Sequence, residues 1–301
     1  METCLVGART ARPLLERESA KNTLKLTRLN FYAFSSANAT MRTSRPRSQG
    51  FMNFTLLRFE SIESTNLEAL RQAKIGAEEG LCIVANQQTS GRGRHGRVWV
   101  SEKDTGLYFS VVLRPKIETR FLPLLTLMSA VVVSDTLSKM YKLKPDIKWA
   151  NDIHIDGKKI CGILAEAIET KKGLAVVVGI GVNLKSSNFP PELLEIATSI
   201  EAETNEIPNL ENLLENLTAK LSNCYKTLTG KDGAEKIRQE WTRRSSYAFG
   251  KKVRAVLANE TIFGKTCGIE ENGALRIKQT NGEIKIIQAG DVEMLRKMPH
   301  K

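Results

Sequence analysis

Short runs that are either continuously apolar or alternate between apolar and polar residues cover the middle of the chain, and such runs predict strands. The runs are Phe54–Glu60, Leu81–Ala85, Leu107–Leu113, Ile147–Ile155, Lys158–Glu169 and Leu174–Leu184. Asp156-Gly157 lies between two of them and favours a tight hairpin turn, and Lys171-Lys172-Gly173 turns the chain again. Because short turns join antiparallel neighbours, we expect a mixed, mostly antiparallel sheet.

Longer stretches with apolar residues three and four apart predict helices that flank this sheet. Ser64 is a suitable N-cap for an amphipathic helix that runs from Asn66 to about Lys74. The longest helix is expected at Phe121–Tyr141, where a broad apolar stripe is typical of a buried helix. Two further helices are expected at Leu210–Thr229 and Ala234–Arg244. The fold class is therefore α+β.

The pattern changes near Ser246, after which only short strands follow. They are expected at Val253–Leu257, Thr261–Ile269, Ala274–Gln279 and Glu283–Gln288, with turns at Asn272-Gly273 and Asn281-Gly282. Closely spaced strands joined by such turns predict a small β-barrel-like domain. We expect three regions: an N-terminal extension (1–51), a main domain (52–245) and a C-terminal β domain (246–301).

Composition narrows the functional classes. The 301 residues carry a formal net charge of +12, and residues 1–50, with seven Arg and two Lys against three Glu, hold +6 of it. The remaining 251 residues therefore hold only +6 and have no long basic run, which argues against a nucleic-acid-binding stripe. No apolar run reaches the roughly 20 residues of a membrane span.

Cysteine and histidine usage excludes further chemistry. The five cysteines are dispersed without a Cys-x-x-Cys pair, which is typical of reduced thiols in a cytosol-like compartment. Only three histidines are present, so a histidine-built metal site or a Ser-His-Asp triad is not expected. The sequence predicts no protein metal site.

Residues 1–51 leave three alternatives open. Their Arg, Ser and Thr content fits a mitochondrial or plastid transit peptide, although Glu16 and Glu18 interrupt it. The segment is otherwise a disordered extension or the product of a misassigned start, with Met41 or Met52 as the true first residue. We expect a cytoplasmic protein, or a mitochondrial or plastid one if the transit peptide is real.

The most unusual stretch is Gly91-Arg92-Gly93-Arg94-His95-Gly96-Arg97, followed by Trp99. Glycines let the main chain approach a ligand closely, and guanidinium groups match carboxylates and phosphates. We therefore expect residues 91–97, the Gly/Arg loop, to become ordered around an anion. The alternative is a solvated basic loop that binds any polyanion. A dinucleotide-binding GxGxxG turn is rejected because residues 97–100 indicate extended chain rather than a helix.

Five polar clusters along the chain together resemble the biotin–protein ligases over roughly residues 54 to 295. They are Ser64-Thr65-Asn66, Gln87 with the Gly/Arg loop, Lys148-Trp149-Ala150-Asn151-Asp152, Lys159-Ile160-Cys161-Gly162-Ile163-Leu164 and Gly179-Ile180-Gly181-Val182-Asn183. The resemblance implies a class II synthetase-like ligase domain followed by an SH3-like β-barrel. Ala150 is a departure, because it stands where the family usually has proline.

The resemblance also implies the reaction. The carboxylate of biotin attacks the α-phosphate of ATP, with Mg²⁺ assisting, and gives biotinyl-5′-AMP and pyrophosphate. A lysine of a biotin carboxyl carrier protein, from acetyl-CoA carboxylase or a related carboxylase, then takes the biotinyl group. Two anions must meet, and unit negative charges about 4 Å apart repel by roughly 1 kcal/mol in water and by more in a drier site. Fixed positive charge is therefore the main requirement.

Site residues follow from the same resemblance. The catalytic candidates are Lys159, Arg94 and Asp152, of which Asp152 would accept the proton of the carrier lysine or else act as a structural acceptor. The biotin-binding candidates are Ser64, Thr65, Asn66, Gln87, Gly91, Arg92, Gly93, Arg94, Lys159 and Gly162. The nucleotide-binding candidates are Arg94, Arg97, Trp99, Lys148, Asn151 and Asn183. Simple structural roles stay open for Ser64 as an N-cap, Trp99 in the core and Lys159 as a surface lysine.

Two rival functions remain. A lipoate or octanoate ligase shares the fold, but the Arg-Gly-Arg pattern favours biotin. A non-enzymatic biotin-responsive regulator would need an N-terminal winged helix, for which residues 1–50 are too short and unpatterned. We therefore expect no contact with DNA or membrane, and the sequence leaves the oligomeric state open, a homodimer included.

Overall fold

The computed structural model describes residues 25–29, 52–187, 189–257, 259–288 and 290–294. The predictions for the N-terminal extension fall outside this part of the chain, except at Lys25–Leu29. That segment forms a strand, β1, which the pattern of residues 1–50 did not predict. It pairs with the strand Phe54–Phe59 at one edge of the main sheet.

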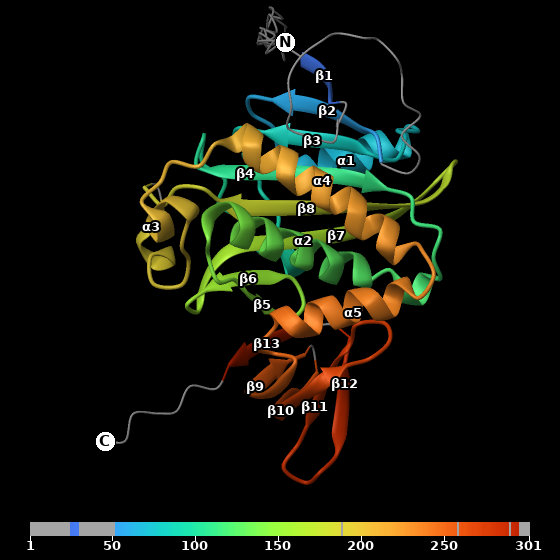
Figure 1. Ribbon diagram of the computed structural model, residues 1–301, viewed down its shortest axis with the longest axis vertical. Helices are drawn as coiled ribbons and strands as arrows, with labels where there is room; N and C mark the ends of the chain where they lie inside the picture. The colour runs from blue at the N-terminus through green and yellow to red at the C-terminus, as the bar shows by residue number, and fades with distance from the viewer. Residues whose placement is uncertain (1–24, 30–51, 188, 258, 289, 295–301) are drawn as a thin grey trace, which may run out of the picture.

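The main domain is built on one eight-stranded sheet with the order β1-β2-β3-β4-β8-β7-β6-β5 (Figure 1). The strands after β1 are β2 (Phe54–Phe59), β3 (Leu81–Ala85), β4 (Gly106–Leu113), β5 (Asp146–Lys148), β6 (Asp152–Ile155), β7 (Lys158–Thr170) and β8 (Gly173–Asn183). Within the described sheet only β2 and β3 run parallel, because a helix crosses between them. The predicted mixed, mostly antiparallel sheet is confirmed.

Helices cover both faces of this sheet, as Figure 1 shows. One face is covered by α1 (Thr65–Lys74), and Ser64 is its N-cap, as predicted. The small residues Ala69 and Ala73 of α1 pack with Ile83 and Val177 of the sheet. The opposite face is covered by α2 (Leu124–Tyr141), α4 (Leu210–Leu228) and α5 (Gly233–Arg244). Shorter helical segments are η1 (Arg94–Gly96), η2 (Thr119–Phe121), η3 (Pro191–Leu193) and α3 (Ile200–Thr204).

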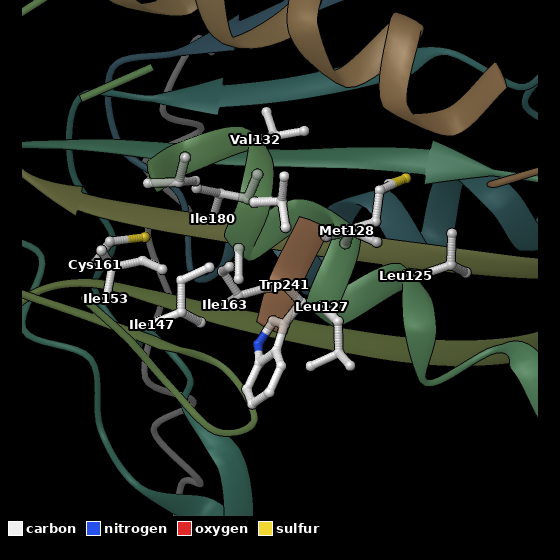
Figure 2. Close-up of a cluster of buried hydrophobic side chains, with 14 of the residues drawn as sticks. Leu125, Leu127, Met128, Val132, Ile147, Ile153, Cys161, Ile163, Ile180 and Trp241 are labelled. Carbon is white, nitrogen blue, oxygen red and sulfur yellow. The ribbon is translucent and has the colours of Figure 1, made fainter. Parts of the chain in front are cut away.

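The larger core lies between the sheet and α2. Figure 2 shows Leu127 and Met128 of α2 beside Ile163 of β7 and Trp241 of α5. Of the described helices, the segment Thr119–Tyr141 is long and apolar enough to cross a membrane by length and composition alone, yet 67% of its apolar window is buried inside the protein. Its apolar surface is therefore already covered by the sheet and by neighbouring helices, as predicted for a buried helix.

The predicted single run Ile147–Ile155 is wrong, because the chain reverses between β5 and β6. The turn is held from outside its own sequence. The indole Nε1 of the buried Trp149 donates to the carbonyl of Gly273 at 2.9 Å, and Asn151 Nδ2 donates to the carbonyl of Ile163 at 3.0 Å. The peptide bond between Trp149 and Ala150 is cis.

The C-terminal strands form a second, antiparallel sheet with the order β12-β11-β10-β9-β13. Their bounds are β9 (Phe249–Val256), β10 (Thr261–Ile269), β11 (Leu275–Lys278), β12 (Ile284–Ile287) and β13 (Asp291–Met294). The four predicted strands are confirmed. The sequence missed β13, a strand of four residues that pairs with β9. The predicted small β domain is thus present, but since β12 and β13 are the edges of the described sheet, the sheet is open and does not close into a barrel.

An ion cluster ties the three helices of the larger core together. Asp135 of α2 accepts hydrogen bonds from Arg244 of α5, and its Oδ2 lies 2.6 Å from Nζ of Lys220 on α4. Burial opposes ionisation of this carboxyl, but the hydrogen bonds from Arg244 and Lys220 prevail and lower the pKa of Asp135 below its ordinary value of 3.8. The carboxylate form therefore stabilises the folded state.

We predict that Asp135→Asn lowers the free energy of unfolding at pH 7 by about 2 kcal/mol, because charge-assisted hydrogen bonds are lost. A carboxyl whose pKa is lowered on folding stabilises the folded state at pH values above its pKa in the unfolded chain. This contribution is lost as the pH falls through the pKa of the carboxyl in the folded protein. The difference between wild type and variant should thus shrink below pH 4, in urea unfolding measured at several pH values. The matched control is Glu215→Gln on the exposed side of α4. An equal loss in both variants would contradict the prediction.

Candidate active site

A pocket lies on the α1 face of the main sheet, at the N-terminal end of α1 and under the Gly/Arg loop. Its floor is made by β7 and β8, and the loop that holds Gly91–Arg97 forms one wall. The sequence-predicted residues that line it are Ser64, Thr65, Asn66, Arg92, Gly93, Arg94, Arg97, Trp99, Asn151, Asp152, Lys159 and Gly162. Twelve residues from four separate clusters of the sequence are thus brought together.

The floor of the pocket is shaped by glycines on adjacent strands. Gly162 of β7 and Gly181 of β8 are register partners, and Gly179 lies two residues before Gly181 on the same face. A Cβ atom at Gly179 would lie 2.0 Å from Oδ1 of Asn66, and one at Gly181 would lie 2.6 Å from the indole of Trp99. Such distances exclude any side chain, so the glycines let Asn66 and Trp99 contact the bare backbone of the sheet.

Trp99 lies across this glycine floor. A Cβ atom at Gly162 would be 2.8 Å from its ring, and Nζ of Lys159 lies 5.3 Å from the ring centroid. The indole Nε1 is buried, and within the described residues it has no hydrogen-bond partner. An unsatisfied buried donor is costly, so this N–H is suited to donate to a polar atom of a ligand.

Lys159, one of the cations that line the pocket, projects from the start of β7. Its Nζ lies 2.7 Å from Oδ1 of Asp152, and the pair is a charge contact rather than an aligned hydrogen bond. Both side chains are only partly exposed, 31% and 20%. The main chain of Lys159 is fixed as well, because its N–H donates to Ile196 and its carbonyl accepts from Thr198.

Arg94 connects three parts of the protein. Its Nη1 donates to Oδ1 of Asn151 at 2.8 Å, and its Nη2 donates to the carbonyl of Gly290 at 3.2 Å. Gly290 lies between β12 and β13, so a loop residue of the main domain reaches the C-terminal sheet. Two acceptors leave further N–H groups of this guanidinium for an anion.

A hydrogen-bond network supports the wall next to α1. The buried hydroxyl of Ser110 lies 2.8 Å from Oγ1 of Thr65 and 2.7 Å from Oδ1 of Asn66. Oε1 of Gln88 accepts from the backbone N–H and the hydroxyl of Thr65, and its Nε2 donates to Ser101 at 2.8 Å. Because Ser101 follows the Gly/Arg loop, this network joins the loop to α1.

Four predicted site residues do not line the pocket, and the structure gives each another place. Gln88 lines the pocket where Gln87 was predicted to do so, since adjacent residues of extended chain face opposite sides. Gly91 is buried at the neck of the loop, where its carbonyl accepts the N–H of Trp99 at 2.9 Å. Asn183 donates its side-chain amide to the carbonyls of Lys159 and Thr198.

Lys148 is the fourth. Lys148 lies on β5, where it is the register partner of Asp152 on β6, and it does not line the pocket. Burial first, and then the charge of Lys148, lower the pKa of His154 on the neighbouring strand.

Sequence reasoning missed several lining residues. They are Gln88, Val98, Tyr108, Phe109, Ile163, Leu164 and Ile180. Most are apolar residues of strands. Their sequence pattern predicts a strand but does not indicate which of its residues border a ligand. The Gly-x-Gly spacing at Gly179 and Gly181 was the one available signal for the floor, and both line the pocket.

The cysteines offer no nucleophile in this pocket. Cys161, two residues after Lys159, is buried, and burial raises the pKa of its thiol. The described cysteines, Cys82, Cys161, Cys224 and Cys267, are all free thiols, as the dispersed spacing predicted. Chemistry in the pocket must therefore rely on its cations and polar groups.

Comparisons with known proteins agree with this geometry. Residues 58–183 match the model of the Biotin/lipoate A/B protein ligase family, and residues 248–295 match that of the Biotin protein ligase C terminal domain. The bifunctional ligase/repressor BirA of Bacillus spizizenii is 37% identical over 238 residues, which are 77% of this chain and 72% of the relative. The biotin–[acetyl-CoA-carboxylase] ligase of Mycobacterium tuberculosis is 28% identical over 77% of this chain and 86% of its own length.

Solved structures are similar over the same region. A biotin protein ligase from Aquifex aeolicus in complex with biotin and ATP has 30% sequence identity and a TM-score of 0.69, and the similarity covers 80% of this chain and 99% of that one. Two family models match, and the relative from Bacillus spizizenii is 37% identical and matched over 72% of its length, so the chain belongs to the biotin protein ligase family.

Proposed function

We propose that this protein activates biotin with ATP to biotinyl-5′-AMP and transfers the biotinyl group to a lysine of a biotin carboxyl carrier protein. One observation carries the proposal: Arg92, Arg94 and Lys159, from two distant segments, converge on a single pocket with a glycine floor. The named functions of the relatives support it, among them a biotin–[acetyl-CoA-carboxylase] ligase. The carrier is accordingly proposed to belong to acetyl-CoA carboxylase or a related carboxylase.

The first step joins two anions. A carboxylate oxygen of biotin forms a bond to the α-phosphorus of ATP, the bond to the β-phosphate oxygen breaks, and pyrophosphate leaves. Arg94 and Lys159 would offset the repulsion between the carboxylate and the phosphate, which is stronger in a partly dry pocket than in water. Arg97, Asn151 and Trp99 are proposed to contact the nucleotide.

The second step needs a neutral amine. The carrier lysine, with an ordinary pKa of about 10.4, must lose a proton before it attacks the carbonyl carbon of the adenylate. Asp152 is proposed as the acceptor of that proton, since its carboxylate lies in the pocket beside Lys159. An amide bond forms and AMP leaves, so no enzyme nucleophile takes part.

The biotin head group is proposed to bind at the wall next to α1. Hydroxyl and amide groups of Ser64, Thr65, Asn66 and Gln88 can pair with the carbonyl and N–H groups of a cyclic urea. The glycine floor and Trp99 would hold the apolar part of the ligand. Asn183 is proposed to act through Lys159, because its side-chain amide donates to the carbonyl of Lys159. Lys148 is proposed to act through Asp152, its register partner on the neighbouring strand.

Mg²⁺ is proposed to arrive with ATP, held mainly by phosphate oxygens. The described residues contain no group of three or more His, Cys, Asp or Glu side chains that could hold a metal ion, and Asp152 is the carboxylate that lines the pocket. Such a donor set fits a magnesium–nucleotide substrate better than a resident metal. The limits of the catalytic domain (52–245) and the C-terminal domain (246–301), the cytoplasmic location and the absence of DNA or membrane contact stay predictions.

The first test is biotin-dependent pyrophosphate release. With ATP, Mg²⁺ and biotin, the purified chain should release pyrophosphate and form biotinyl-5′-AMP, detected by mass spectrometry. Lipoate and octanoate, assayed side by side, should give only background release. Release with lipoate and none with biotin would assign the chain to the rival ligase class.

Lys159→Ala should slow adenylate formation by about 100-fold or more, because one fixed charge at the reacting groups is lost. The matched control is Lys158→Ala on the same strand, whose Nζ donates to the carbonyl of Leu194 outside the pocket. The control should keep nearly full activity. Single-turnover formation of biotinyl-5′-AMP measures both, and an unchanged rate in Lys159→Ala would remove this lysine from the mechanism.

Arg94→Ala should release the adenylate about tenfold faster than wild type, since charge-assisted hydrogen bonds between loop and ligand are lost. His95→Ala, an exposed neighbour on the same loop, is the matched control. Dissociation of labelled biotinyl-5′-AMP into excess unlabelled adenylate gives the two rates. Dissociation of the adenylate from Arg94→Ala at the wild-type rate would contradict a role of Arg94 in holding the adenylate.

A further inference from the structure

Glu166 of β7 contacts two residues that line the pocket, Asn66 and Arg92. Its Oε2 accepts a hydrogen bond from Nδ2 of Asn66 at 2.8 Å, and its Oε1 lies 3.2 Å from Nη2 of Arg92. Asn66 and Arg92 both line the pocket, whereas Glu166 does not. One carboxylate therefore joins the start of α1 to the Gly/Arg loop, and its side chain is only 23% exposed.

The position of Glu166 follows from strand geometry. Gly162, Leu164 and Glu166 alternate along β7 and face the same side of the sheet, which is the face covered by α1. The carboxylate thus lies on the same strand and the same face as Gly162, next to Asn66 at the start of α1. Asn66 reaches it because Gly179, on the adjacent strand, has no side chain in the way.

Glu166 also fixes which way the amide of Asn66 points. An ionised carboxylate only accepts hydrogen bonds, so the NH₂ group of Asn66 must face it. The same Nδ2 donates to the carbonyl of Leu164 at 3.2 Å, which uses both of its hydrogens. Oδ1 of Asn66 is left to accept from Ser110 at 2.7 Å. The orientation of one predicted biotin-binding group is thereby set.

The contact with Arg92 acts on the loop. A guanidinium group has five N–H donors in a rigid plane, so pairing with Glu166 at one nitrogen leaves others for a ligand anion. The side chain of Arg92 is 40% exposed and would otherwise sample many rotamers. Holding it beforehand lowers the entropy lost when a ligand binds.

We propose that Glu166 is a positioning residue that couples the biotin-binding wall to the Gly/Arg loop, by orienting Asn66 and Arg92 together. The inference rests on the proposed biotin activation. Glu166 touches no reacting atom, so its loss should weaken the retention of biotin and of biotinyl-5′-AMP more than it slows the chemical step.

Two variants separate the two contacts. Glu166→Gln keeps an oxygen that can accept from Asn66 but loses the charge that pairs with Arg92, and Glu166→Ala loses both contacts. The matched control is Glu169→Gln, an exposed carboxylate on the same strand. All three are compared with wild type in pyrophosphate release, in dissociation of biotinyl-5′-AMP and in thermal unfolding.

In Glu166→Gln, the KM for biotin and the rate of adenylate dissociation should rise about tenfold, as expected for a lost charge-assisted contact. The kcat at saturating biotin should change less than either of them. Glu166→Ala should show a larger rise, and Glu169→Gln should match wild type. Equal values in Glu166→Gln and Glu169→Gln would overturn the proposal.

A double-mutant cycle with Arg92→Met distinguishes positioning from general stability. If Glu166 acts on the loop through Arg92, Glu166→Gln should add little to the dissociation rate in the Arg92→Met background. Full additivity of the two changes would overturn the coupling. Should Glu166→Ala fail to fold, Glu166→Gln and the cycle still decide. A wild-type protein that releases no pyrophosphate with biotin would refute the proposed function instead, which separates the two failures.

Discussion

The structure depends on keeping several positive charges together before any anion is present. Three cations of the pocket have acceptors of their own: Glu166 for Arg92, Asn151 and the carbonyl of Gly290 for Arg94, and Asp152 for Lys159. These partners offset the mutual repulsion of the cations in a site that is only partly exposed. Because an arginine keeps further donors when one or two are used, the pocket stays able to bind carboxylate and phosphate.

Close approach to the sheet is the second requirement. Gly162, Gly179 and Gly181 leave bare backbone where Asn66 and Trp99 lie, and a Cβ atom at any of the three would lie only 2.0 to 2.8 Å from one of these side chains, so even alanine would displace them. The cost of glycines inside two strands is reduced by the long pairing of β7 with β8, in which the neighbouring Ile163, Ile180 and Val182 are buried. The opposite face of the same strands carries the core against α2. One sheet thus supports the core with one face and the ligand pocket with the other.

The sequence predicted what local patterns determine. The strand alternation and Asp-Gly turn gave β7 and its neighbours, and the Gly/Arg and Lys-x-x-Gly elements gave Arg92, Arg94 and Lys159. It failed where partners are distant. The reversal at Trp149 depends on a carbonyl 124 residues away, and the contact of Glu166 with Asn66 spans 100 residues. The prediction named Gln87, whereas its neighbour Gln88 lines the pocket, because composition does not show which way a residue faces in irregular extended chain.

The C-terminal sheet completes the site rather than merely following it. Arg94 of the loop donates to Gly290, and Trp149, next to the turn that holds Asn151, donates to Gly273. Asn151 in turn accepts from Arg94, so the loop, the turn and the C-terminal sheet form a closed set of contacts. The orientation of Arg94 thus depends on contacts with both sheets. The motif alone places Arg94 in the main domain and does not reveal its contact with Gly290.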